Sequence, residues 1–164
     1  MSWVDEVKQS IPPYASDVKS NLEIAMEHSS LTELDAHACA LAASCAISNG
    51  GLANEISMNG PLFGKDEREN AKTAAVTAAM LDSYYSFSEV VVDSTAPAVT
   101  VYERYSGEER VKFVMYSLAA AITLRSTYTA MYVDQLRLSG VSDQQIKDIA
   151  KIAAVISAIN KIVA

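Results

Sequence analysis

Apolar residues recur at helical spacing along almost the whole chain, and this periodicity limits the folds open to it more than any other feature. The clearest case is a C-terminal stripe that a helix would place on one face: Ile146, Ile149, Ile152, Ile156 and Ile159. Ser142 and Gln145 have the spacing of a capping box just before it. A valine-rich stretch near residues 90–101 has local strand character but no partner strands elsewhere. The sequence therefore predicts an all-α bundle of about 7–9 helices.

Prolines, glycines and capping residues set the expected helix boundaries. Pro12 and Pro13 end the first helix, Asn49-Gly50-Gly51 is expected to stop the third, and Gly140 the seventh. The polar and aromatic run 82–87 is expected to interrupt the fifth helix, and a further break is expected near Leu124. Residues 93–107 are expected to form a loop. The predicted helices span 2–10, 13–27, 32–48, 52–58, 65–92, from 108 to the break, on to 138, and a last helix after Ser142.

The chain has 164 residues, of which half are hydrophobic and a fifth are charged, with a net charge of −7. This suits a single domain over residues 1–164 that buries a sizeable core. The acidic balance argues against a nucleic-acid-binding surface. No run of 18 apolar residues and no basic, apolar leader is present, so we expect no membrane span and a cytoplasmic protein.

The only two cysteines, Cys39 and Cys45, lie six residues apart in one alanine-rich helical segment. Six residues rotate a helix by roughly 240° beyond a full turn and advance it by about 9 Å. The two thiols therefore point to different faces and cannot form a disulfide within the helix. His28 and His37 are the only histidines, and no metal-ligand spacing involves them, so we expect no metal and no cofactor. His37 and Cys39 should lie on different sides of their helix.

Arg125, Tyr128 and Tyr132 fall at positions i, i+3 and i+7, which predicts that they share one helix face. One cation and two phenols on one face suit either a polar pocket or a cation–π contact at a subunit boundary. The sequence leaves both alternatives open.

Four runs in the correct order together resemble the alkyl hydroperoxidase D (AhpD) family, within the carboxymuconolactone decarboxylase-like group. The first, beginning at Pro12, is similar to the family's P-x-Y-A-x-D-x-K-x-N-L. The others are the alanine-rich segment from Asp35 to Leu52, the alanine-rich helix and aromatic turn of 71–91, and the run from Leu136 through Gly140 and its following helix. The resemblance implies the AhpD helical fold, a homo-oligomer (trimer or hexamer), and a peroxiredoxin-type or paralogous partner.

The resemblance also implies where the family's redox motif, C-x-x-C-x-x-x-H, would fall. Counting back from Gly140, the two cysteine positions are Arg125 and Tyr128. The two histidine positions are Thr127 and Tyr132, and the proton-relay glutamate corresponds to Phe113. Arginine and tyrosine supply neither sulfur nor a base near neutral pH. The resemblance thus favours the family's fold and argues against its dithiol mechanism.

Three functional hypotheses follow. The first is an AhpD-like protein without the redox-active cysteine pair, with a structural, regulatory or small-ligand-binding role. The second is an antioxidant alkyl hydroperoxide reductase that uses a relocated thiol, Cys39, with His37. The third is a non-redox enzyme similar to carboxymuconolactone decarboxylases, in which Arg125 binds a carboxylate and Tyr128 or Tyr132 acts as an acid.

Overall fold

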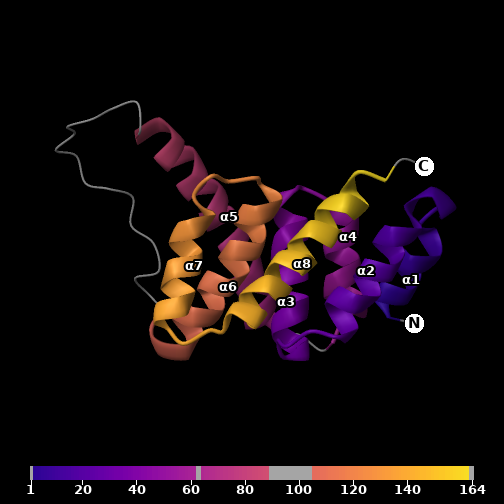
Figure 1. The fold of residues 1–164 in the computed structure, drawn as a ribbon, viewed down its shortest axis with the longest axis horizontal. Coiled ribbons are helices and arrows are strands. Elements are labelled where there is room, and N and C mark those ends of the chain that lie inside the picture. Colours follow the sequence, from indigo (N-terminus) through magenta and orange to yellow (C-terminus); the bar gives the residue numbers. More distant parts are fainter. Residues whose placement is uncertain (1, 62–63, 89–104, 163–164) are drawn as a thin grey trace.

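The computed structural model describes residues 2–61, 64–88 and 105–162, and within these ranges helices are the only regular secondary structure. This confirms the all-α prediction and its number of helices. Figure 1 shows α1 and α2 at one end of the bundle and α6 and α7 at the other. In chain order the elements are α1 (Trp3–Ser10), the 3-10 turn η1 (Pro13–Ala15), α2 (Ser16–Glu27), α3 (Glu33–Ala46), α4 (Gly50–Asn59), α5 (Lys65–Ser88), α6 (Gly107–Thr123), α7 (Thr129–Leu138) and α8 (Asp143–Asn160).

Side-chain caps begin four of these helices, because the first backbone N–H groups of a helix have no partner within it. The Ser2 hydroxyl caps α1 and the Thr32 hydroxyl caps α3, each by accepting from the backbone N–H three residues later. Ser142 and Gln145 form the expected capping box at the start of α8. Asn49 caps α4 by accepting from the Leu52 N–H at 3.1 Å.

Two expected boundaries are wrong. Gly50 and Gly51 do not stop α3 but form the first turn of α4, because the Asn49 side chain caps that helix. The stop itself is made by Ser48, which adopts a left-handed φ of 57°. The polar run 82–87 does not interrupt α5, which continues without a break to Ser88. That run contains no glycine or proline to end a helix.

The expected boundaries after α5 can be compared with the structure only in part. The expected end of the helix near residue 92 and most of the loop expected over 93–107 lie outside the described residues. Gly107, expected in that loop, is instead the first residue of α6.

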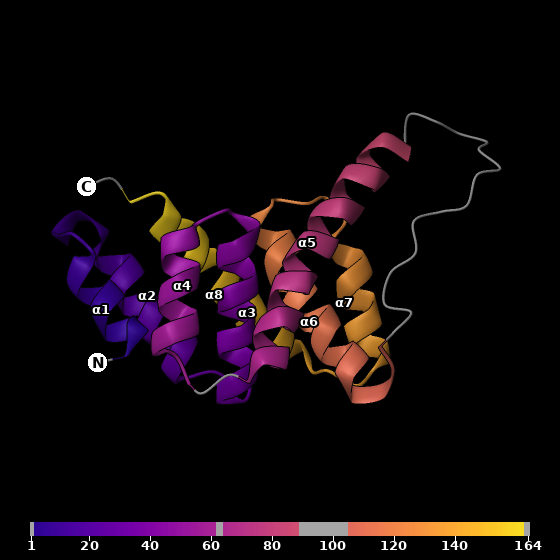
Figure 2. The same cartoon turned by 180° about the vertical axis from the view of Figure 1, so that it is seen from behind.

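Helix α3 is the centre of the bundle. It packs against α6, α5 and α8, and every residue from Asp35 to Ser44 is buried. Figure 1 shows α8 crossing α3, and Figure 2, from behind, shows α3 between α4 and α5. Alanines make up much of this helix, and their small side chains let several neighbouring helices approach it closely. No helix in the described part of the chain is long and apolar enough to cross a membrane.

We predict that enlarging a central alanine of α3 destabilises the fold. Ala40 is fully buried, so Ala40→Leu should lower the free energy of unfolding by about 1–3 kcal/mol through overpacking. The control is Ala130→Leu on the exposed side of α7, which should change it by less than about 0.5 kcal/mol. Urea denaturation followed by circular dichroism measures both. Equal stability of the two variants would contradict close packing around α3.

Candidate functional site

The thiol of Cys39 lies in the interior of the bundle. Its side chain is fully buried, and its sulfur donates to the backbone oxygen of Met115 on α6 at 3.9 Å. Burial, reinforced by the negative charge of Asp35, raises the pKa of Cys39 well above its usual range. Because the thiolate is the reactive form of cysteine, this position is unsuited to nucleophilic chemistry.

Cys45 lies further along α3, is only partly buried, and forms no disulfide with Cys39. Burial raises its pKa, and the positive charge of Lys72 on α5 opposes part of that rise. The continuous helix between the two cysteines places them six residues apart on different faces. The expectation that they cannot pair within α3 therefore follows directly from the observed helix.

His37 faces a different neighbour from Cys39. Its Nδ1 lies 2.8 Å from the backbone oxygen of Glu33, and since a carbonyl only accepts, this nitrogen carries the proton. Its ring meets Trp3 of α1 edge-on, with centroids 5.9 Å apart. Burial lowers the pKa of His37 and favours the neutral imidazole. His37 therefore packs toward α1 while Cys39 contacts α6, and the two do not form a nucleophile–base pair.

The expected stripe of Arg125, Tyr128 and Tyr132 on one helix face is wrong. Arg125 lies in the corner between α6 and α7, with a left-handed φ of 56°. Its N–H donates to the Ile122 oxygen, and the next N–H donates to the Ala121 oxygen, each at 3.0 Å. This pair of bonds ends α6 in a Schellman motif, so the helix does not continue through Arg125. The expected break near Leu124 is confirmed.

The side chains in and after this corner differ in burial and do not share one environment. Arg125 and Thr127 are exposed, whereas Tyr132 in α7 is only 1% exposed. Tyr128 is half-buried, and its ring packs against Tyr85 of α5 with centroids 5.4 Å apart. The corner therefore does not gather these side chains around one common pocket.

Phe113 lines a cavity together with polar residues that the sequence analysis did not identify as a site. Its buried ring stacks on Tyr105, with centroids 4.5 Å apart, and lines a cavity of about 280 Å³ between α3, α5 and α6. Most of the side chains that line it are polar or charged. The lining residues are Leu34, Asp66, Glu67, Asn70, Glu108, Glu109, Lys112, Phe113 and Tyr116.

A buried hydrogen bond lies beside this cavity. The Tyr116 hydroxyl of α6 donates to Asp35 Oδ1 of α3 at 2.8 Å, and Lys112 Nζ lies 3.8 Å from the same oxygen. Burial, followed by the charge of Asp35, raises the pKa of Tyr116, which therefore stays protonated as a donor. The signal in the sequence is weak, because an aspartate in a first helical turn is also explained by the helix dipole.

The lining of the cavity contains hydrogen-bonding and aromatic side chains but no sulfur. Lys112 presents an ammonium and the lining carboxylates present acceptors, whereas the Tyr116 O–H is donated to Asp35. Such a mixture suits holding a small polar molecule. Over the residues that the structure describes, no three histidine, cysteine or carboxylate side chains gather as metal ligands.

Comparison with curated proteins finds relatives along nearly the whole chain. Alkyl hydroperoxide reductase AhpD of Azorhizobium caulinodans is 27% identical over 161 residues, covering 94% of this chain and 89% of the relative. The AhpD of a Methylobacterium species is 28% identical over 163 residues, covering 95% and 93%. The AhpD of Streptomyces griseus is 27% identical, covering 95% and 92%. No family model matches the chain. This is an AhpD-like protein.

The family assignment from the sequence is thus confirmed, but the placement of the motif positions stays a prediction. In this AhpD-like chain the implied cysteine positions, Arg125 and Tyr128, lie just before the first residue of α7. Phe113 and Tyr132 are buried, and Thr127 is exposed. Both thiols of the chain lie instead on α3.

We predict that His37 makes the stability of this AhpD-like fold depend on pH. Its pKa is lowered in the folded state, so the unfolded chain binds a proton more readily below about pH 6.5. Stability should therefore be full above that pH and fall as the pH drops below it. His37→Gln should flatten this slope, whereas the exposed His28→Gln should leave it unchanged. Urea denaturation from pH 5 to 8 measures the slopes; equal slopes in wild type and His37→Gln would contradict the prediction.

Proposed function

We propose that this AhpD-like protein has lost the redox-active cysteine pair and acts as a non-peroxidatic member with a small-ligand-binding, structural or regulatory role. One observation carries the proposal: the only two thiols of the chain lie on α3, where Cys39 is fully buried and Cys45 lies on a different face of the helix. We further propose a single domain over residues 1–164, a cytoplasmic location, a homo-oligomer (trimer or hexamer) and a peroxiredoxin-type or paralogous partner.

The chemistry of thiol peroxidases explains why this placement matters. A thiolate attacks the O–O bond, which releases an alcohol and leaves a sulfenic acid. A second thiol then attacks that sulfur, and the disulfide forms with release of water. The first step needs an accessible thiolate and the second needs a thiol within bonding reach. In this chain Cys39 lacks the accessibility and Cys45 lacks the reach.

The alternative of a relocated thiol fits the structure less well. It requires Cys39 to be activated by a base, and His37 packs against Trp3 instead. Cys39 contacts the backbone of Met115, and the nearby charge of Asp35 opposes ionisation of the thiol. Burial acts in the same direction as that charge, so the thiolate is disfavoured twice.

The decarboxylase-like alternative also gains little support. It places a substrate carboxylate on Arg125 with Tyr128 or Tyr132 as the acid. Arg125 is exposed at the α6–α7 corner, and Tyr132 is almost completely buried. A substrate held by the guanidinium would therefore not reach the Tyr132 hydroxyl without a rearrangement of α7.

The cavity beside Tyr116 supports the ligand-binding form of the proposal. Two buried side chains, Tyr116 and Asp35, meet there, with Lys112 close to the same carboxylate. A buried polar side chain with a raised pKa at a cavity, as Tyr116 is here, is a common feature of binding sites. Phe113 contributes an aromatic wall to the same cavity.

We predict that the purified protein shows no thiol-dependent turnover of alkyl hydroperoxides. Cumene hydroperoxide with dithiothreitol as reductant should be consumed at the rate seen without protein. Ellman's reagent should label Cys45 slowly and Cys39 only after unfolding, because Cys39 is buried. The variant Cys45→Ser should abolish native labelling, and Cys39→Ser serves as the matched control. Catalytic turnover that is lost in Cys39→Ser would overturn the proposal in favour of the relocated thiol.

We predict that small polar molecules bind beside Tyr116. A set of small organic cations, acids and amides is screened for a rise in the melting temperature, since a ligand of the folded state stabilises it. Tyr116→Phe should reduce the rise, because it removes the hydroxyl at the cavity. Tyr14→Phe, at a side chain that is 70% exposed, is the control and should leave the rise intact. No stabilisation by any probe, or equal rises in both variants, would contradict ligand binding at this cavity.

A further inference from the structure

A second cavity, of about 460 Å³, lies where the start of α1, the end of α2 and the start of α3 meet, and we call it the α1–α3 cavity. It shares no lining residue with the cavity beside Tyr116, so the two are separate. Four of its lining side chains are apolar and at most 9% exposed: Val4, Met26, Leu31 and Ala36. Its volume and apolar surface are typical of sites that hold the body of a small organic molecule.

The charged side chains of the α1–α3 cavity are acidic. Glu27 and Glu33 line it, and its lining contains no lysine or arginine. Within the described part of the chain, neither carboxylate forms an ion pair. The positive charge of Lys8 on α1 acts on Glu27 from a distance, but Lys8 Nζ is paired with Glu23 at 2.7 Å. The two carboxylates therefore leave a negative charge at the cavity that no side chain of the lining neutralises.

Helix dipoles explain one of these carboxylates and not the other. Glu33 lies in the first turn of α3, where the positive end of the helix stabilises an anion. Glu27 is the last residue of α2, where the negative end of the helix destabilises one. A positively charged group beside Glu27 interacts favourably with its carboxylate and with the end of α2. This end of the cavity therefore suits a cation.

His37 adds a buried polar ring to the same lining. It is 8% exposed, and its Nδ1–H is donated to the Glu33 backbone oxygen at 2.8 Å. Burial lowers the pKa of His37, so the ring is neutral near pH 7 and does not repel a cation. Trp3 meets this ring edge-on, so a molecule bound in the cavity lies close to the indole.

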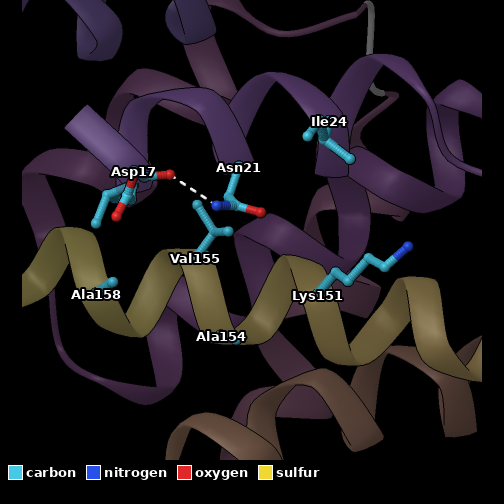
Figure 3. A pocket seen from close by; sticks show the side chains of 8 residues that line it. Asp17, Asn21, Ile24, Lys151, Ala154, Val155 and Ala158 are labelled. Carbon is cyan, nitrogen blue, oxygen red and sulfur yellow. Dashed lines mark hydrogen bonds between the residues drawn. The ribbon is translucent and has the colours of Figure 1, made fainter. Parts of the chain in front are cut away.

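Two other hollows of the bundle have a different charge pattern. The groove between α2 and α8 has Asp17 at one end and Lys151 at the other, so its charges are mixed (Figure 3). The cavity beside Tyr116 has more carboxylates, but Lys112 lines it too. Its acidic side chains also lie in the first turns of α5 and α6, where helix dipoles stabilise them. Of these three hollows, only the α1–α3 cavity combines carboxylates with no ammonium.

We propose that the α1–α3 cavity binds a small organic cation, namely a primary ammonium group on an apolar body. The carboxylates of Glu27 and Glu33 accept from the ammonium, which has three N–H donors. The apolar body is removed from water against the buried side chains of the lining. A metal ion fits less well, because over the described residues no three histidine, cysteine or carboxylate side chains gather as ligands.

Trp3 provides the readout, because it is the only tryptophan and its ring centroid lies 5.9 Å from that of His37. Hexylammonium at pH 8, where an alkylamine is protonated, should change the Trp3 emission in a saturable way. The neutral 1-hexanol should bind at least about tenfold more weakly, and hexanoate should not bind. Isothermal titration calorimetry measures the same affinities. No saturable binding of hexylammonium, or equal affinity for hexanol, would overturn the proposal.

The matched variants are Glu27→Gln and Glu109→Gln, which remove the same charge at exposed positions of the two cavities. Glu27→Gln should weaken hexylammonium binding at least about threefold, because a charged contact is lost. Glu109→Gln should leave it unchanged, and circular dichroism shows that each variant is folded. Equal affinities of the two variants would contradict binding in the α1–α3 cavity.

This inference goes beyond the proposed function and does not depend on a ligand beside Tyr116 or on the loss of the redox pair. Tyr116→Phe should therefore bind hexylammonium as tightly as wild type does. Weaker binding in Tyr116→Phe and in Glu109→Gln, with unchanged Trp3 emission, would assign the cation to the cavity beside Tyr116 and overturn the inference. The absence of any ligand beside Tyr116 would count against the proposed function alone.

Discussion

The burial of α3 from Asp35 to Ser44 is the constraint on which the rest of this structure depends. A helix enclosed by α5, α6 and α8 must carry small side chains, because neighbouring backbones approach it from several directions. The alanines from Ala36 to Ala43 meet that requirement. The same enclosure determines the chemistry of Cys39, whose thiol is kept neutral by its surroundings rather than by any feature of its own sequence neighbourhood.

Two buried carboxylates connect this core to the rest of the bundle. Asp35 accepts from Tyr116 of α6, and Asp148 of α8 accepts from the backbone and hydroxyl of Ser30 before α3. Burial by itself would raise the pKa of Asp148, but the hydrogen bonds from Ser30, together with Lys151, lower it overall. Each carboxylate is therefore tolerated in the interior because donors from another element satisfy it.

The likeness to AhpD proteins and the positions of the thiols together carry the functional argument. The likeness covers nearly the whole chain. Within that framework the chain places its thiols on the central helix and presents a cavity lined by Phe113 and Tyr116. The proposal of a non-peroxidatic, ligand-binding role is based on this placement, because a dithiol–disulfide cycle needs two thiols within bonding reach.

The sequence by itself determined the helices and their caps, because period and capping act over a few residues. The α8 stripe with its Ser142–Gln145 box is the clearest example, and the separation of the two cysteines follows from the same local geometry. Local patterns could not foresee that Asn49 starts a helix or that Arg125 adopts a left-handed backbone. They also could not bring Asp35 to Tyr116, 81 residues away, or place Asp17 of α2 and Lys151 of α8 along one groove. Only tertiary packing decided these, since burial and long-range contact depend on how the helices assemble.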